Sequence, residues 1–197
     1  MARRNPAGTG EPLPPASTAP APADPGSQDP EPDPESVART ICLRLLTARA
    51  RSRAELAEAL RARNVPDDAT ARVLDRLAEV GLVNDRAFAA DFVQAKRAER
   101  GLAARELGRQ LRGKGVADEA IDAALADLGE DAERTAARRL AERKLRSMSG
   151  LTVQVQIRRL AGMLARKGYS PGLSFQVVRE VVGEAASEHF DSDTMLA

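Results

Sequence analysis

Apolar residues recur three and four positions apart through most of the chain, from about residue 36 to about residue 183. Nowhere in this region do apolar and polar positions alternate for long. The spacing is typical of amphipathic α-helices, because 3.6 residues make one helical turn, whereas strand side chains alternate between two faces. The pattern therefore predicts an all-α fold.

The first 35 residues lack this period. They contain all of the chain's 12 prolines except Pro66 and Pro171, and they include the run DPEPDPE. Such a segment buries too little apolar surface to offset the entropy that is lost when a chain becomes ordered. We expect a disordered N-terminal tail over residues 1–35.

The chain also resembles itself. The stretch ELAEALRARNVPDDATARVLDRL (55–77) overlays ELGRQLRGKGVADEAIDAALADL (106–128) without a gap, and RLAGMLARKGYSPGLSFQVVREV (159–181) is a looser third copy. The three starting positions are 51 and 53 residues apart, a period typical of repeat proteins. In such proteins a single repeat cannot bury its apolar face alone.

Helix boundaries can be read within each repeat. Ser52 and Glu55 have the spacing of a capping box. Asn64, Gly115 and Gly168 each follow a basic residue, as expected just past a helix end, where the backbone turns to positive φ. Each repeat is thus predicted to be a three-helix bundle with a long first helix, a short second helix and a third.

Charge divides the chain in the same way. Residues 1–35 carry two arginines against six acids, and residues 184–197 carry four acids and no Lys or Arg, so each end has a net charge of −4. Because the whole chain is +1, residues 36–183 have a net charge of +9, which favours a polyanionic neighbour. We predict the following division: a tail rich in proline and acid (1–35), three-helix repeats (36–83, 84–129 and 130–183) and an acidic C-terminal tail (184–197).

Two of the chain's four phenylalanines, Phe88 and Phe92, lie within the segment GLVNDRAFAADFV (81–93). Gly81 can end one helix, and the Asn or Asp that follows can cap the next. We expect both rings, together with Leu82, to form a hydrophobic joint between the first two repeats. The alternative is the wall of a ligand pocket.

The segments RSRAEL, VPDDATARVLDRLAEVGLVNDRAFAADFV and LRGKGV resemble the RecX family, regulators of the RecA recombinase, and RRLAGMLARKGYSP and VVREVV resemble the last repeat of that family. The resemblance covers residues 36–183. It implies three tandem three-helix repeats in an elongated, curved array that binds along the groove of a RecA filament on DNA. It also implies inhibition of ATP hydrolysis, strand exchange and co-protease activity, with a place in DNA recombination, DNA repair and the SOS response. The implied partners are the RecA filament and, weakly and without sequence preference, single- and double-stranded DNA, contacted by a monomer.

No catalytic, cofactor or metal site is predicted. The chain has no phosphate-binding G-x-x-x-x-G-K-[ST] loop. Its single cysteine, Cys42, and its single histidine, His189, are far apart in sequence, and we expect Cys42 to act as a small buried apolar residue. No apolar run has the length of a signal peptide core or a membrane span. We expect a cytoplasmic protein that is not an enzyme and uses no cofactor.

Basic side chains remain as candidates for contact with DNA or with the recombinase, the alternative being a solvated surface with local ion pairs. The candidates are Lys96, Arg97, Arg100, Arg105, Arg109, Lys114, Arg138, Arg139, Arg143, Lys144, Arg158 and Arg159. Two other functions stay open. One is a helix-turn-helix-like DNA-binding protein, which the Asp and apolar residues of the first two third helices disfavour. The other is a helical-repeat interaction scaffold.

Overall fold

The computed structural model describes residues 33–194, and for residues 186–194 it describes only the backbone. The tail predicted over residues 1–35 therefore lies outside the described residues up to residue 32. The first helix already begins at Pro34, because the Asp33 carboxylate accepts hydrogen bonds from the backbone amides of Glu35 and Ser36 and caps it.

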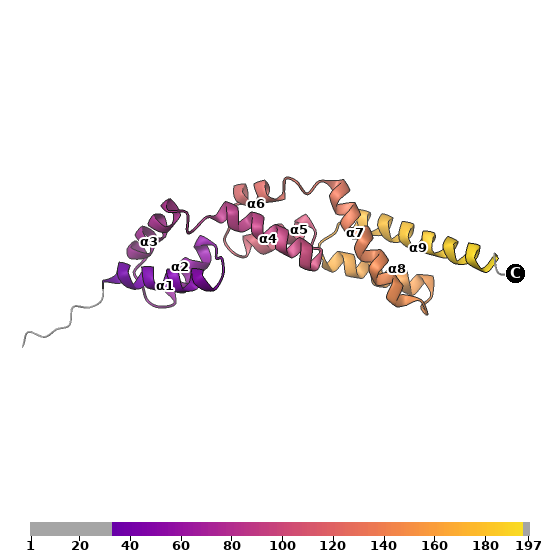
Figure 1. The fold of residues 1–197 in the computed structure, drawn as a ribbon, viewed down its shortest axis with the longest axis horizontal. Helices are drawn as coiled ribbons and strands as arrows, with labels where there is room; N and C mark the ends of the chain where they lie inside the picture. Colours follow the sequence, from indigo (N-terminus) through magenta and orange to yellow (C-terminus); the bar gives the residue numbers. More distant parts are fainter. Residues whose placement is uncertain (1–32, 195–197) are drawn as a thin grey trace, which may run out of the picture. The chain divides into compact units, whose positions relative to one another are not determined.

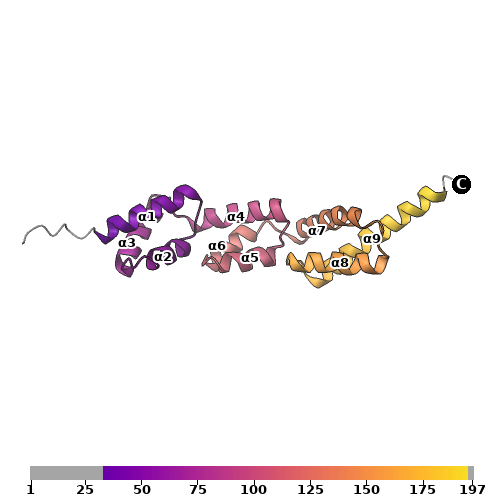
Figure 2. The same cartoon turned by 90° about the horizontal axis from the view of Figure 1, so that it is seen from below.

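Within residues 33–194 all regular structure is helical, and the helices follow one another in three groups of three (Figures 1 and 2). The first repeat contains α1 (Pro34–Ala48), α2 (Arg53–Arg61) and α3 (Asp67–Glu79). The second contains α4 (Asp85–Arg100), α5 (Ala104–Arg112) and α6 (Asp118–Leu125). The third contains α7 (Glu130–Leu145), the 3₁₀ turn η1 (Arg146–Met148), α8 (Val153–Arg166) and α9 (Pro171–Thr194). The prediction of an all-α fold made of three tandem three-helix repeats is confirmed.

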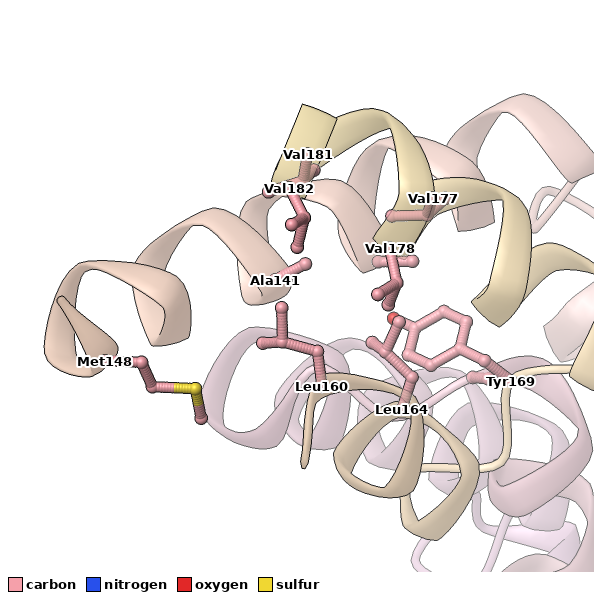
Figure 3. Packing of buried hydrophobic residues seen from close by; sticks show 11 residues of the cluster. Ala141, Met148, Leu160, Leu164, Tyr169, Val177, Val178, Val181 and Val182 are labelled. Atoms are coloured by element: carbon pink, nitrogen blue, oxygen red, sulfur yellow. The ribbon is translucent and has the colours of Figure 1, made fainter. Parts of the chain in front are cut away.

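Each repeat has a hydrophobic core of its own. The second helix of every repeat buries two leucines one turn apart, at positions that the sequence repeats superpose: Leu56 and Leu60, Leu107 and Leu111, Leu160 and Leu164. In the third repeat these leucines face the valines of α9 (Figure 3). Cys42 packs in the first core as a small buried residue, and burial raises the pKa of its thiol.

The predicted caps are present. Ser52 and Glu55 form a reciprocal capping box at the start of α2. The Asn84 side chain accepts a hydrogen bond from the Ala87 amide at 3.0 Å and caps α4. Beyond the second helices, Asn64, Gly115 and Gly168 have φ of 58°, 69° and 92°, which ends each helix as the sequence predicted.

The third repeat departs from the predicted pattern. Its second helix, α8, has 14 residues, whereas α2 and α5 have nine, because no helix-breaking residue separates Val153 from the repeated segment. Its third helix does not end near residue 183 but continues to Thr194. Residues 184–194, predicted to be an acidic tail, contain no Pro or Gly and begin Glu-Ala-Ala, which favours continuation of the helix.

Neighbouring repeats are joined through the amino end of a second helix. At the first joint the Ser52 hydroxyl donates to the Lys114 carbonyl at 2.6 Å, and the Lys114 ammonium binds the Glu55 carboxylate at 2.8 Å. The Arg53 amide donates to Asp85, the first residue of α4, at 2.9 Å. These contacts fix α2 against the turn that follows α5.

The second joint repeats this arrangement 51 residues further along the chain, at the amino end of α5. The Ala103 amide donates to the Lys167 carbonyl at 2.9 Å, and the Ala104 amide donates to Glu133 of α7 at 2.6 Å. In addition, the Tyr169 hydroxyl donates to the Gly101 carbonyl at 3.1 Å. The turn after α8 is therefore held against α5 as the turn after α5 is held against α2.

Close packing at the joints explains why two positions are occupied by glycine. A Cβ atom at Gly115 would overlap the Ala54 methyl group, and one at Gly168 would lie 2.9 Å from the Glu106 nitrogen. Both residues also have positive φ, which L side chains adopt at a cost. Asn64, at the same position in the first repeat, is exposed, so a side chain is tolerated there.

We predict that Gly115→Ala lowers the free energy of unfolding more than Gly81→Ala does. Both glycines have positive φ, so each substitution costs about 1–2 kcal/mol in backbone strain. Only Gly115 packs against another repeat, and overpacking adds about 1–3 kcal/mol, whereas no atom lies within 4 Å of a Cβ at Gly81. Urea denaturation of both variants measures the difference, and equal losses would contradict the joint packing.

Candidate nucleic-acid interface

Phe88 and Phe92 belong to the core of the second repeat. Their ring centroids are 6.2 Å apart, and the Lys114 ammonium lies 6.0 and 5.7 Å from them. The rings pack within the second repeat and not between repeats, so the prediction that they form the hydrophobic centre of the first joint is wrong. Leu82, predicted to pack beside them, is 52% exposed, because its neighbour Val83 turns into the core of the first repeat instead.

Four of the twelve candidate cations are half-buried, and each has a partner inside the fold. Lys96 pairs with Glu99 at 2.8 Å, and Arg97 of α4 donates to the Ala132 carbonyl of α7 at 2.8 Å. Lys114 is the joint residue described above. Arg138 binds Glu142 of its own helix, together with Glu180 and Glu184 of α9. Arg97, Lys114 and Arg138 link different helices, and Lys96 pairs within α4, so each of the four has a partner inside the fold.

Glu55 shows how strongly Lys114 is engaged. Burial raises the pKa of Glu55, but hydrogen bonds from Lys114, Arg49 and the Ser52 backbone outweigh this effect and hold the pKa at about 2. The carboxylate is thus ionised throughout the neutral range, and Lys114 has a constant partner. This cation is structural, and its charge is already paired within the joint.

The other eight candidates are exposed. Arg109 pairs with Glu106 at 2.6 Å, and hydrogen bonds from Arg109 and then Gln110 hold the pKa of Glu106 at about 2. Among the described residues, the remaining seven have no side-chain ion pair or hydrogen bond: Arg100, Arg105, Arg139, Arg143, Lys144, Arg158 and Arg159. Arg100 lies near Glu99 and helps lower the pKa of that carboxyl; the other six are free to meet an external anion.

Three of these seven cations line a hollow of about 780 Å³ between α4 and α7, the α4–α7 hollow. They are Arg100, Arg139 and Arg143, and the structural Arg97 and Lys167 complete the basic lining. Burial lowers the pKa of Lys167, and the neighbouring charges of Arg100 and Arg143 lower it further. The five cations outnumber the two carboxylates of the lining, Glu99 and Asp131, so the hollow has a positive potential.

A second hollow of about 410 Å³ lies between the end of α7 and α8, the α7–α8 hollow. Its basic residues are Lys144, Arg158, Arg159 and Arg166, and no carboxylate is among its lining residues. Sequence reasoning missed Arg166 and Lys167 as site residues. Arg159 and Arg166 are seven residues apart, two turns of one helix, and this spacing could have indicated Arg166. The predicted candidate Arg105, by contrast, lines neither hollow.

The described residues contain no group of three His, Cys, Asp or Glu side chains placed to hold a metal ion. His189 lies in the part of α9 whose side chains are outside the described residues. No helix in the described part of the chain is long and apolar enough to cross a membrane.

Comparison with known families matches all three repeats in order. The first three-helix domain of RecX matches residues 38–77, the second matches residues 84–125 and the third matches residues 131–178. The chain belongs to the RecX family. The resemblance seen in the sequence is thereby confirmed.

Individual relatives agree with this family. The chain is 51% identical over 151 residues to regulatory protein RecX of Streptomyces coelicolor, an alignment that covers 77% of this chain and 80% of that protein. It is 46% identical over 156 residues to regulatory protein RecX of Thermobifida fusca, covering 79% of this chain and 84% of the relative. The crystal structure of RecX from Lactobacillus salivarius has a TM-score of 0.67 at 21% identity, over 76% of this chain and 97% of that one. This last likeness supports the RecX fold.

We predict that Glu55→Gln makes the free energy of unfolding of this RecX chain depend less on pH in the acidic range. A carboxylate whose folded pKa is lowered from 4.5 to about 2 stabilises the fold above the higher value, and this contribution is lost as the pH falls between the two. The substitution should therefore lower the free energy of unfolding at about pH 7 and have much less effect at about pH 2.

The measurement is urea denaturation at both pH values, with Glu58→Gln as the control. Glu58 is exposed on the same helix and has no ion pair among the described residues. A Glu55→Gln variant as stable as the wild type at neutral pH would show that the Glu55–Lys114 contact does not stabilise the joint.

Proposed function

We propose that this protein is a non-catalytic regulator that binds RecA filaments on DNA and inhibits their ATP hydrolysis, strand exchange and co-protease activity. The observation that carries the proposal is the match of three consecutive RecX domains to the three folded repeats. Relatives that share about half of its residues are named regulatory proteins. On this basis the protein acts in DNA recombination, DNA repair and the SOS response, as a cytoplasmic monomer.

The unpaired cations support the same proposal. A RecA filament on DNA presents a polyanion, and exposed arginines without internal partners lose no ion pair when they bind it. The basic residues gather on α4, α7 and α8, in the second and third repeats. A regulator of a nucleoprotein filament needs a surface that can lie against negative charge, and the two basic hollows provide such a surface.

A helix-turn-helix reader of duplex sequence is less compatible with the charge of the third helices. The first turn of α3 carries Asp67 and Asp68, and the first turn of α6 carries Asp118 and Glu119. The amino end of a recognition helix normally approaches base edges and phosphates, which these carboxylates would repel. Tight operator-like binding to one duplex sequence in moderate salt would favour this alternative.

We predict that the purified protein inhibits ATP hydrolysis by its cognate RecA in the presence of single-stranded DNA. Inhibition should reach its maximum well below one copy per recombinase subunit if the protein blocks filament growth, because one bound copy then affects many subunits. The measurement is a titration of steady-state hydrolysis. Undiminished hydrolysis, with a folded protein and an active recombinase, would exclude the proposed function.

A further inference from the structure

Both internal joints follow one pattern, and the overlay of the repeats shows which residues hold the same positions at the ends of the array. In each joint the turn after a second helix, Lys114–Gly115 or Lys167–Gly168, lies against the amino end of the second helix one repeat earlier. Two halves of such a joint are left over. One is the turn Arg63–Asn64 after α2, and the other is the segment 156–159 of α8, which overlays 52–55 and 103–106.

Matching end halves would join separate copies of the chain. The first repeat of one copy would then dock on the third repeat of another. A head-to-tail contact of this kind uses two different surfaces, so every added copy offers a free end to the next one and the assembly grows without limit. Whether the protein polymerises in this way therefore depends on the residues at the two end halves.

The end half in the first repeat does not match, because of one side chain. Asn64 takes the position of Gly115 and Gly168 and has the same positive φ, but it carries a Cβ atom. A Cβ at Gly115 would lie 2.3 Å from the Cβ of Ala54, and one at Gly168 would lie 2.5 Å from the Cβ of Glu106. Asn64 therefore obstructs the close approach of a helix end to this turn.

The end half in the third repeat lacks the donor of the joint. Ser52 and Ala103 cap their helices from outside, and each donates to the carbonyl of the following turn. Their counterpart Gln156 lies inside α8, which begins one turn earlier. The Gln156 backbone amide donates to the Thr152 carbonyl and its side-chain amide to the Met148 carbonyl, both at 3.0 Å. The early start of α8 thus uses the groups that a joint would need.

The charges of the two end halves repel each other. At the first joint the Lys114 ammonium binds the Glu55 carboxylate. At the end halves these two positions hold Arg63 and Arg159. Both arginines are exposed, and neither has an ion pair among the described residues. Two like charges would therefore meet where the internal joint has a salt bridge.

We propose that Asn64, Gln156 and Arg159 close the two ends of the array to each other, so that copies of this protein do not join head to tail and bind a RecA filament as independent units. Terminal repeats of repeat proteins carry caps that keep the array soluble, and these residues have that role here. Steric, hydrogen-bonding and electrostatic obstacles act on the same contact. The closed ends follow from the repeats alone, and only the mention of the filament rests on the proposed function.

Independent binding has a consequence for regulation. A contact between neighbouring copies would couple their binding and make it cooperative, so that inhibition would rise steeply over a narrow range of concentration. Copies with closed ends distribute themselves among filaments instead. Inhibition then rises gradually with the number of copies bound.

The test opens each end separately. The first variant, Arg63→Lys with Asn64→Gly, gives the turn after α2 the residues of the two docked turns. The second variant, Gln156→Ser with Ile157→Pro and Arg159→Glu, gives α8 an amino end like that of α2. Proline at residue 157 removes a helical amide and favours extended backbone at residue 156, where serine can then cap the shortened helix.

Sedimentation velocity compares the wild type, each variant alone and the two variants mixed. The wild type and each single variant should stay monomeric, because every possible pair contains a closed half. The mixture should form one-to-one pairs that do not grow, and a chain with all five substitutions should form longer assemblies as its concentration rises. Amide chemical shifts of the labelled first variant, titrated with the unlabelled second, detect pairing that is too weak to sediment together.

Two results would overturn the closed ends. One is head-to-tail association of the wild type. The other is a mixture in which both variants keep their helix content by circular dichroism and yet show neither pairs nor shift changes. One-to-one pairing in the mixture alone would support the proposal.

A reciprocal variant tests the same residues without depending on a new contact. Glu55→Arg with Gly115→Asn places the closing residues in the first joint. Its matched control, Glu58→Arg with Gly81→Asn, makes the same changes at an exposed glutamate of α2 and at a glycine with positive φ and open space around it. The joint variant should unfold at lower urea than the control, and equal midpoints would show that these residues do not obstruct a joint.

A titration of RecA ATP hydrolysis with the wild type separates this proposal from the proposed function. Inhibition that rises without cooperativity would support independent binding, and a steep, cooperative rise would reject it. If the variants pair in the mixture but the wild type does not inhibit, the closed ends stand and the proposed function fails.

Discussion

The arrangement of the three repeats depends on one kind of contact. In it, the turn that ends a helix binds the amino end of a helix in the preceding repeat. The Lys114 and Lys167 carbonyls lie just past helix ends, where carbonyls have no partner within the helix. Ser52 and Ala103 are the N-cap residues of α2 and α5; the first joint uses the Ser52 side-chain hydroxyl as the donor, and the second uses the Ala103 backbone amide. Each joint gives one of these carbonyls a partner, and because every repeat has a separate core, these joints couple one core to the next.

The two joints bind the carbonyl at the same position of the repeat, but the donor and the side chains around it differ. At the first joint Lys114 pairs with Glu55 and lies near two aromatic rings. At the second joint Glu106, the counterpart of Glu55, is already paired with Arg109. Lys167 then binds the Arg100 carbonyl and lines the α4–α7 hollow instead. The lysine at this position of the repeat thus binds a carboxylate at the first joint and a backbone carbonyl at the second.

Sequence alone predicted the parts of the fold that depend on local chemistry. The 3.6-residue period, the capping box at Ser52 and the positive φ at Gly115 and Gly168 all follow from residues close together in the chain. The choice of Val83 over Leu82 for the core was not predicted, because two adjacent apolar residues after a turn fit either face. The long third repeat was missed because the looser copy gives no signal for where α8 begins or where α9 ends.

The candidate site was harder to predict because it depends on pairing between distant segments. Arg138 and Arg139 are adjacent in sequence, yet one is held by carboxylates of α9 and the other faces a hollow. Glu142, one turn further along α7, is a local sign that Arg138 is paired, but the two α9 carboxylates that also bind Arg138, Glu180 and Glu184, come from more than 40 residues further along. Composition could indicate a polyanionic partner, but only the folded arrangement shows which cations remain unpaired. For a protein that binds through charge, the unpaired cations and not the total number of cations define the binding surface.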